Sequence, residues 1–492
     1  MKRLITFLVA MMMIAQVMLI CASADGAVLV NINEDNPIKE VDSMMYGINF
    51  EWGGNWSETK VVKGEGITEI NPEYVKAFQG CMPTMRAAGM SANRMYWKGA
   101  VGPYSQRTNQ TFWYFKPRKQ TFGPVEWIKS GQMIQKDCQF VYTVNLNDTQ
   151  ENIADLVEFL RGDGTINYNG GINWAQKRIE YGIPDPVPIF AFELGNELDA
   201  GSEGAWTKER YTAACKETIA TIRSIDPDAK IAVMKLTSFP GDWYKWHREV
   251  FKELASEIEY VVMHHYYAVN DTSGIEKYIK KMADDCAAIP GAEDIQILFT
   301  EHSCKPKSSV WSETYDYELP HTITGVLETA EWFARMNRSE NVRGAWYHCI
   351  KSSSWAVEYP YEDTVKLTAI GDLLRMCNNN FVGTSVEIDQ AGYNPSSETQ
   401  IITSAVLTDD GMNIMLVNET ANPVTYNFTF KNKYKLVGET VMYGDNFEAD
   451  NYRGKEEVKY IDEKIDSQGE FSTYTDRGIS LTILHLKKQD QE

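Results

Sequence analysis

The sequence lacks several features that mark common functional classes. Lys and Arg total 48 against 68 Asp and Glu, so the chain carries a formal net charge of −20 at pH 7. Phosphate backbones repel such a surface, and we therefore predict no nucleic-acid partner. The eight cysteines include no Cys-x-x-Cys pair, so no zinc-knuckle motif is present. We expect neither a metal ion nor a cofactor.

Internal repeats and low-complexity stretches are also absent. Hydrophobic residues make up 43% and aromatic residues 12% of the chain, which excludes a disordered protein and permits a large core. The length of 492 residues is enough for more than one domain. The many tryptophans and tyrosines favour a carbohydrate partner, because sugars bind to flat aromatic faces. Nothing in the sequence indicates an oligomeric state.

The first 24 residues have the pattern of a secretory signal peptide. Lys2 and Arg3 precede an apolar run, and Ala22-Ser23-Ala24 provides the small residues of a cleavage site. The alternative is an anchor helix that is not cleaved. We expect cleavage, a secreted mature protein and no membrane attachment.

Eight apolar runs with β-branched and aromatic residues follow, and amphipathic helix patterns such as Asn71–Ala88 separate them. This alternation predicts a (β/α)8 TIM barrel over residues 45–379. An open, doubly wound sheet is the alternative, but it normally has a glycine-rich loop after its first strand, and none occurs here. The predicted strands are 46–52, 91–97, 139–146, 189–197, 230–236, 259–267, 295–303 and 343–351.

The pattern changes after about residue 380. Short strands separated by turn residues, such as Asp409-Asp410-Gly411, continue to the end without a helix pattern. Residues 380–492 therefore predict a C-terminal β-sandwich domain. The segment 25–44 precedes the barrel and alternates like a strand at 28–33, so we expect it to join the sandwich.

Two glutamates, Glu197 and Glu301, end the fourth and seventh predicted strands. Functional groups of a (β/α)8 barrel gather at the C-terminal ends of its strands, so both carboxylates are candidates for catalysis. Glycoside hydrolysis with retention uses such a pair, in which one residue is the acid and base and the other the nucleophile. We predict these roles for Glu197 and Glu301, respectively.

Other polar and aromatic residues at the predicted strand ends are candidates for binding a sugar. Asn196 precedes the acid, and strand alternation is taken to direct His265 and Tyr267 towards the barrel mouth. Arg94 could instead form an ion pair, and Trp346 could belong to the core. The candidate substrate-binding residues are Glu51, Arg94, Asn196, His265, Tyr267 and Trp346.

These motifs resemble those of a known family. Gly195-Asn196-Glu197 on strand 4 and a glutamate on strand 7 resemble the clan of retaining (β/α)8 glycoside hydrolases. Tyr46-Gly-Ile-Asn-Phe-Glu51, Phe192-Glu-Leu-Gly-Asn-Glu197 and a C-terminal β-sandwich resemble family 51 α-L-arabinofuranosidases most closely. The chain departs from that family after Arg94, where Met-Tyr-Trp-Lys-Gly replaces x-Pro-Gly-Gly, and at Thr-Glu301-His-Ser, where Glu-Trp is commoner.

The resemblance implies a retaining glycoside hydrolase that removes terminal arabinofuranosyl groups from plant polysaccharides or oligosaccharides. Glu51 would contact the sugar. Alternatives within the clan are an endo-acting glucanase or xylanase, a β-xylosidase and a β-glucuronidase. A carbohydrate-binding protein without catalytic activity is the alternative from another class.

Overall fold

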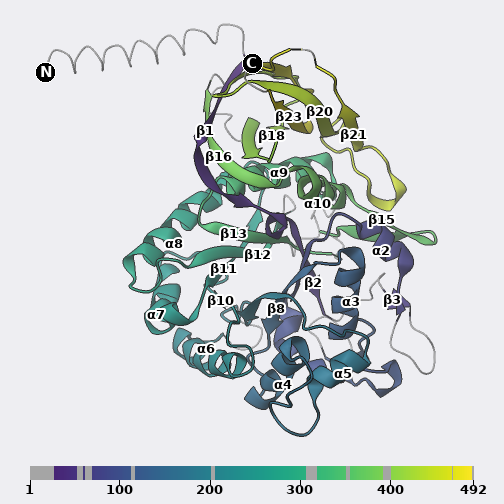
Figure 1. The fold of residues 1–492 in the computed structure, drawn as a ribbon, viewed down its shortest axis with the longest axis vertical. Coiled ribbons are helices and arrows are strands. Elements are labelled where there is room, and N and C mark those ends of the chain that lie inside the picture. The colour runs from purple at the N-terminus through teal and green to yellow at the C-terminus, as the bar shows by residue number, and fades with distance from the viewer. Residues whose placement is uncertain are drawn as a thin grey trace, which may run out of the picture.

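The computed structural model describes residues 27–52, 59–60, 69–111, 117–200, 205–305, 319–350, 355–391, 401–467 and 469–489. They form a barrel surrounded by helices and a second domain built on a large β-sheet (Figure 1). The predicted signal peptide lies outside the described residues. None of the helices described is long and apolar enough to span a membrane.

The first domain is a closed barrel of eight parallel strands, which follow one another around the barrel in chain order. The predicted fold class, a (β/α)8 barrel followed by a β domain, is confirmed. The barrel strands are β2 (Gly47–Glu51), β5 (Thr84–Ala88), β8 (Gln139–Val144), β9 (Ile189–Leu194), β10 (Ile231–Met234), β11 (Tyr260–Tyr267), β12 (Gln296–Cys304) and β13 (Val342–Tyr347).

Helices connect these strands and cover the outside of the barrel (Figure 1). Two of them, α3 and α5, were not predicted from the sequence. The helices are α2 (Pro72–Phe78), α3 (Pro124–Ile134), α4 (Gln150–Arg161), α5 (Trp174–Glu180), α6 (Lys208–Arg223), α7 (Tyr244–Leu254), α8 (Glu276–Ala288), α9 (Ile323–Asn337) and α10 (Ala369–Asn380).

The second barrel strand lies earlier in the chain than predicted. The prediction of a helix over Asn71–Ala88 and a strand over 91–97 is wrong, because α2 ends at Phe78 and β5 occupies Thr84–Ala88. Met, Arg and Ala favour helices intrinsically, but burial between β2 and β8 overrides that preference. Pro83, which cannot continue a helix, was the available signal. Met90–Arg94 form a short 3-10 helix instead of a strand.

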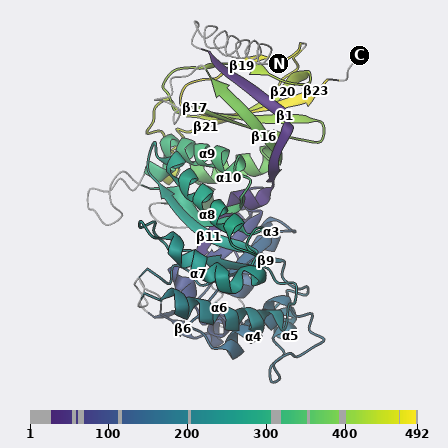
Figure 2. The same cartoon turned by 90° about the vertical axis from the view of Figure 1, so that its left-hand side faces the viewer.

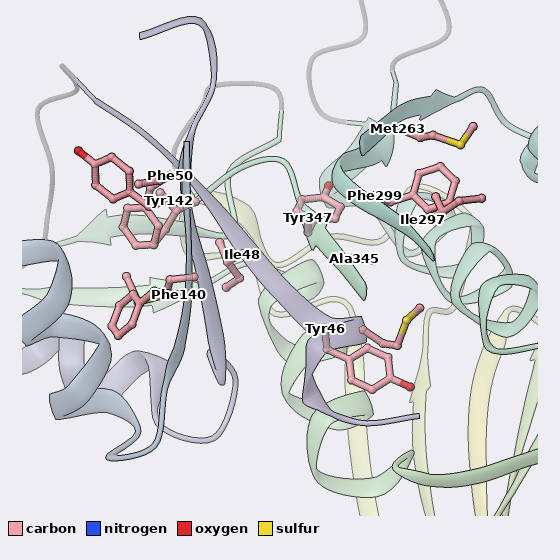
Figure 3. Packing of buried hydrophobic residues seen from close by; sticks show 14 of the residues in the cluster. Tyr46, Ile48, Phe50, Phe140, Tyr142, Met263, Ile297, Phe299, Ala345 and Tyr347 are labelled. Atoms are coloured by element: carbon pink, nitrogen blue, oxygen red, sulfur yellow. The ribbon is translucent and has the colours of Figure 1, made fainter. Parts of the chain in front are cut away.

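Alternate side chains of the strands form two layers. Phe140, Met263 and Phe299 point outward to the helices and are part of the main core (Figure 3). Their neighbours Val141, Val262 and Leu298 fill the inside of the barrel. The outward position of Met263 sets which residues of β11 reach the interior, because side chains alternate along a strand.

The second domain contains nine strands in one hydrogen-bonded sheet. The N-terminal strand β1 lies within it, antiparallel to β16 and parallel to β19. The sheet curls over a core of its own, and the Tyr474 hydroxyl of β22 donates to Glu439 of β20 at 2.7 Å. Its strands are β1 (Val28–Val41), β16 (Gly383–Ala391), β17 (Ile401–Leu407), β18 (Gly411–Asn418), β19 (Thr425–Thr429), β20 (Tyr434–Tyr443), β21 (Lys459–Lys464), β22 (Thr473–Thr475) and β23 (Ser480–Lys488).

Helices α9 and α10 lie between the sheet and the barrel (Figure 2). Met415 of β18 and Ile483 of β23 are buried in the same apolar cluster as Val326 of α9 and Leu373 of α10. One face of the sheet therefore completes the core of the first domain, and the other encloses the core of the second.

Candidate active site

The Glu197 carboxylate is held at the mouth of the barrel by an unusual turn after β9. Gly195 has a φ of 75° and Glu197 a φ of 48°, both in the left-handed region. A Cβ at Gly195 would lie 2.5 Å from Leu198 Cδ1, so this position requires glycine. A non-glycine residue with positive φ is strained, and such strain is typical of functional sites.

Glu301 reaches the interior through a bulge in β12. Met263 of β11 pairs with Phe299, but the next residue, His264, pairs with Glu301, so Thr300 is an extra residue in β12. Thr300 Oγ1 donates to Glu193 Oε1 at 3.1 Å, which shows that Thr300 also faces inward. A bulge places two successive side chains on the same face and can re-aim a residue next to an active site.

The two candidate catalytic carboxylates lie close together. One oxygen of Glu197, one of Glu301 and one ring nitrogen of His264 all lie within 4.8 Å of one another. This spacing is consistent with the carboxyl separation of about 5–5.5 Å in retaining glycosidases, and it is shorter than the roughly 6.5–9.5 Å of inverting enzymes. The Glu197 side chain is 17% exposed and that of Glu301 only 5%.

Arg86 of β5 joins the two strands that carry these glutamates. Its Nε and Nη2 donate to Glu193 at 2.6 Å each, and Nη1 donates to Glu301 Oε1 at 2.9 Å. Nη2 also donates to Asn196 Oδ1 at 2.8 Å. The guanidinium is fully buried. Arg94, predicted as a substrate-binding residue or an ion-pair partner, is instead a partly buried residue of the following 3-10 helix. Arg86 was missed because the second strand was predicted too late in the chain.

Asn93 fixes the backbone beside Glu197. Its Nδ2 donates to the Asn196 carbonyl at 2.6 Å, and its Oδ1 accepts from the Asn196 N–H at 3.0 Å. Asn196 Nδ2 is buried and has no hydrogen-bond partner among the described residues. This amide is therefore available to a hydroxyl group of a bound molecule.

His264 and Tyr266, not His265 and Tyr267, face the carboxylates. His264 Nδ1 lies 2.7 Å from Glu197 Oε1, and the Tyr266 hydroxyl donates to Glu301 Oε2 at 2.6 Å. The prediction had the right alternation but the wrong phase, since Met263 points outward.

The two predicted residues of β11 contact helix α9 instead. Trp332 Nε1 donates to His265 Nδ1 at 3.0 Å, and the Tyr267 hydroxyl donates to Thr329 at 3.1 Å. Neither can reach a molecule bound at the carboxylates.

Trp346 belongs to the core. It is fully buried and donates from Nε1 to Thr84, the first residue of β5, at the opposite end of the barrel. The aromatic group at the mouth is formed by Tyr266, His348 and Trp355, whose rings are 5.5–5.6 Å apart. Trp355 follows the last barrel strand, and the apolar pattern of that strand gave no signal for it.

Glu51 lies at the same mouth, where its Oε2 accepts from Ser91 at 3.1 Å. A Cβ at Gly89, whose φ is 75°, would lie 1.7 Å from Glu51 Oε1, so glycine is needed to admit this carboxyl. Burial and, to a smaller extent, the charge of Glu301 raise the pKa of Glu51 to about 8. Glu51 is therefore protonated at neutral pH.

The pKa values of Glu301 and His264 shift in the directions that favour their charged forms. Burial alone would raise the pKa of Glu301, but His264, His348 and Arg86 lower it well below its usual range, and the hydrogen bond from Tyr266 acts in the same direction. Burial alone would lower the pKa of His264, but the charges of Glu301 and Glu197 raise it. Glu301 is thus an ionised carboxylate next to the positively charged groups of His264 and Arg86.

The cluster of Glu197, His264 and Glu301 also has the spacing of metal ligands. Arg86, bonded to Glu301, already supplies the positive charge that an ion would provide. The arrangement therefore functions chemically as a charge-compensated pair of carboxylates.

Comparison with known proteins agrees with these features. Residues 84–284 match the family model of the alpha-L-arabinofuranosidase 1 domain. The chain is 25% identical over 223 residues to an intracellular exo-α-(1→5)-L-arabinofuranosidase of Streptomyces lividans, covering 45% of this chain and 33% of that protein. It is 24% identical over 298 residues to the protein of the same name from Acetivibrio thermocellus, covering 55% and 57%. The matches span from a third to somewhat over half of these relatives.

Solved structures match over nearly the whole chain. The α-L-arabinofuranosidase of Thermotoga maritima, in its arabinose complex, has a TM-score of 0.78 at 17% identity and covers 94% of this chain and 100% of that one. A family 51 arabinofuranosidase from Xanthomonas axonopodis pv. citri has the same TM-score at 16% identity, with coverage of 94% and 100%. The resemblance to the retaining (β/α)8 clan, and to family 51 within it, is confirmed.

We predict that Arg86→Lys destabilises the protein strongly. Lysine cannot form the forked contacts with Glu193 and leaves buried acceptors unpaired. We expect the free energy of unfolding to fall by about 3–5 kcal/mol, as measured by urea denaturation with tryptophan fluorescence. Arg94→Lys is the matched control and should change it by less than about 1 kcal/mol. Equal losses in both variants would contradict the assignment of Arg86.

We also predict that His264 titrates above its usual pKa of 6.5. Because the folded-state pKa exceeds the unfolded one, the stabilisation from its charge is fully present below the unfolded pKa and is lost as pH rises through the folded pKa. An NMR titration of histidine-labelled protein should show the raised pKa of His264, and the His264→Asn variant identifies its resonance. Glu197→Gln should lower the pKa; a value at or below 6.5 in the unsubstituted protein would refute the prediction.

Proposed function

We propose that this chain, which resembles the family 51 α-L-arabinofuranosidases in sequence motifs and in fold, is a retaining glycoside hydrolase. We propose further that it removes terminal arabinofuranosyl groups from plant polysaccharides or oligosaccharides. The observation that carries the proposal is the pair Glu197 and Glu301, with oxygens within 4.8 Å at the mouth of a barrel. The names of the two arabinofuranosidases matched by sequence support the choice of sugar.

Glu301 is the nucleophile in this proposal. It is ionised, because its pKa is lowered, and Tyr266 and Arg86 direct its two oxygens. Its carboxylate attacks the anomeric carbon while the bond from that carbon to the leaving oxygen breaks, which gives a glycosyl-enzyme ester. The buried position of Glu301 protects the ester from random attack by water.

Glu197 is the acid in the first step and the base in the second. Its Oε1 lies against His264, and its partly exposed carboxyl group can reach the leaving oxygen. In its protonated form it gives its proton to that oxygen and becomes a carboxylate, which then takes a proton from the water that attacks the anomeric carbon and releases Glu301. No cofactor takes part in either step.

The residues around the pair position the sugar. Asn196 Nδ2, which has no partner among the described residues, can donate to a sugar hydroxyl. The protonated Glu51 can donate to another. The aromatic group of Tyr266, His348 and Trp355 offers an apolar face to the ring.

Aryl glycosides provide the direct test of this function. We expect the purified protein to hydrolyse an aryl α-L-arabinofuranoside with a kcat/KM at least about tenfold above that for the xyloside, glucoside and glucuronide, since a mismatched hydroxyl in a polar site costs more than about 1.4 kcal/mol. A preference for one of the other sugars, or for internal bonds of xylan or glucan, would overturn the assignment of arabinofuranose. Binding without hydrolysis of any substrate would exclude an enzyme.

Variants of the two glutamates serve as controls for the mechanism. Glu301→Gln should lose activity on every substrate by at least about 10⁴-fold. Glu197→Gln should lose about 10²–10⁴-fold on substrates with poor leaving groups and less on activated aryl glycosides, which need no acid. Ordinary activity of Glu301→Gln would refute the double displacement.

We further propose that the mature enzyme is exported. The support is the signal pattern of residues 1–24, whereas the relatives above are named as intracellular proteins. N-terminal sequencing of the protein from the culture medium should begin after Ala24. Retention of an intact N-terminus inside the cell would contradict export.

A further inference from the structure

A second group of carboxylates, separate from the candidate active site, lies between the two domains. Glu328 and Glu331 are three residues apart on one face of α9, and Glu419 directly follows β18 of the sheet domain. One oxygen of each lies within 4.8 Å of the others. Glu328 and Glu331 are 1% and 0% exposed.

In each of the two carboxylates of α9, one oxygen accepts hydrogen bonds and the other has none. Glu328 Oε1 accepts from the backbone N–H of Asn270 at 2.8 Å, and Glu331 Oε1 accepts from Arg335 at 2.6 and 2.8 Å. The second oxygen of each is buried and has no hydrogen-bond partner among the described residues. Buried carboxylate oxygens without a partner are costly.

Further oxygens without partners lie at the same place. Both oxygens of Glu419 and Oγ1 of Thr272 are buried and unpartnered within the part of the chain that the structure describes. Thr272 Oγ1 faces Glu331 and is fully buried. Four carboxylate oxygens, from two domains, therefore have no donor other than the Thr272 hydroxyl, which lies in the 3-10 helix before α8 and faces Glu331.

The charges at this cluster do not balance. If ionised, the three carboxylates and Glu276, which shares Arg335 with Glu331, would carry four negative charges, and Arg335 and Arg338 supply two positive ones. Two negative charges remain in a buried position, and Asp271 lies nearby with a further one. A divalent cation would neutralise them and satisfy the free oxygens together.

We infer that Glu328, Glu331 and Glu419, with Thr272, form a binding site for a hard divalent cation, and that the ion is Ca²⁺. All the available ligands are oxygens, which hard cations prefer to nitrogen or sulfur. Ligands about 2.4 Å from Ca²⁺ lie up to about 4.8 Å apart, which agrees with the observed spread, and water completes its 6–8 ligands. Mg²⁺ requires shorter bonds and stricter octahedral geometry.

The position of the site gives the ion a structural role. Along the chain, helix α9 follows β12, which carries Glu301, and precedes β13. Glu419 belongs to the sheet domain. The cation would join the two domains across the helix that supports the nucleophile strand. This role does not depend on which sugar the enzyme cleaves.

Protons are the alternative occupants. Burial first, and then mutual repulsion among the carboxylates, raises the pKa of Glu328 to about 8 and raises that of Glu419 well above its usual range. Without a cation these groups would take up protons, so binding of Ca²⁺ should release protons into the buffer.

Calorimetry and thermal unfolding of the full chain, treated with a chelator and then titrated with Ca²⁺ alone, test the proposal. We expect about one ion per chain, an enthalpy that changes with the ionisation heat of the buffer, and an unfolding temperature about 3 °C or more higher at 100 times the dissociation constant. Absence of binding, or tighter binding of Mg²⁺ or Zn²⁺ than of Ca²⁺, would overturn it.

Glu419→Gln is the decisive variant, because glutamine keeps the size of the side chain and its amide can still hydrogen-bond Glu331. It should weaken Ca²⁺ binding at least tenfold and abolish the thermal shift, yet leave the metal-free protein as stable as the unsubstituted one or more so. A general loss of structure would lower both unfolding temperatures. Retention of the full shift by Glu419→Gln would overturn the proposal.

Two control variants locate the ion. Glu301→Gln removes a carboxylate from the other cluster with ligand spacing, and Glu463→Gln removes an exposed one from β21. Both should keep the Ca²⁺ shift. If Ca²⁺ has no effect and the unfolding temperature falls as pH rises from 5 to 9, the raised pKa values mean that the cluster holds protons, and the cation site is refuted.

Discussion

The buried guanidinium of Arg86 is the interaction on which the candidate active site depends. It bonds Glu193 on β9, Glu301 on β12 and the side chain of Asn196, so that one cation fixes both strands that bear the proposed catalytic residues. Burying these charges would be unfavourable without a partner for each. Arg86 allows Glu301 to remain ionised although its side chain is almost fully buried. A carboxylate must be ionised to act as a nucleophile.

Backbone irregularities then decide where the side chains go. The extra residue in β12 turns Glu301 towards the interior, and the left-handed φ of Gly195 and Glu197 lifts the second carboxylate to the mouth. Both features interrupt a regular barrel strand at its C-terminal end. A regular alternation in β12 would have directed Glu301 at the helices, where His302 now packs on Trp332 at 3.9 Å.

The barrel, the second domain and the strand-end positions of the two glutamates could be predicted from the sequence, because they depend on the length, apolar content and polar ends of strands. The predictions were wrong where the position of a single residue decided the outcome. Strand β5, which carries Arg86, was predicted as a helix because its residues favour helices. The outward position of Met263 means that His264, and not His265, faces the carboxylates. Trp346 was chosen and Trp355 missed, because a strand pattern cannot distinguish the two ends of a barrel or describe a loop.

The two carboxylate clusters show how the same burial leads to different chemistry. At the mouth, His264 and Arg86 counter the negative charge, so Glu301 is ionised, whereas burial raises the pKa of its neighbour Glu51. Between the domains, Arg335 and Arg338 would leave two negative charges uncompensated if all the carboxylates were ionised. The first cluster is therefore complete with protein groups alone, whereas the second needs a partner from solution. Because α9 carries two of its ligands and lies against the nucleophile strand, whatever neutralises the second cluster also supports the first.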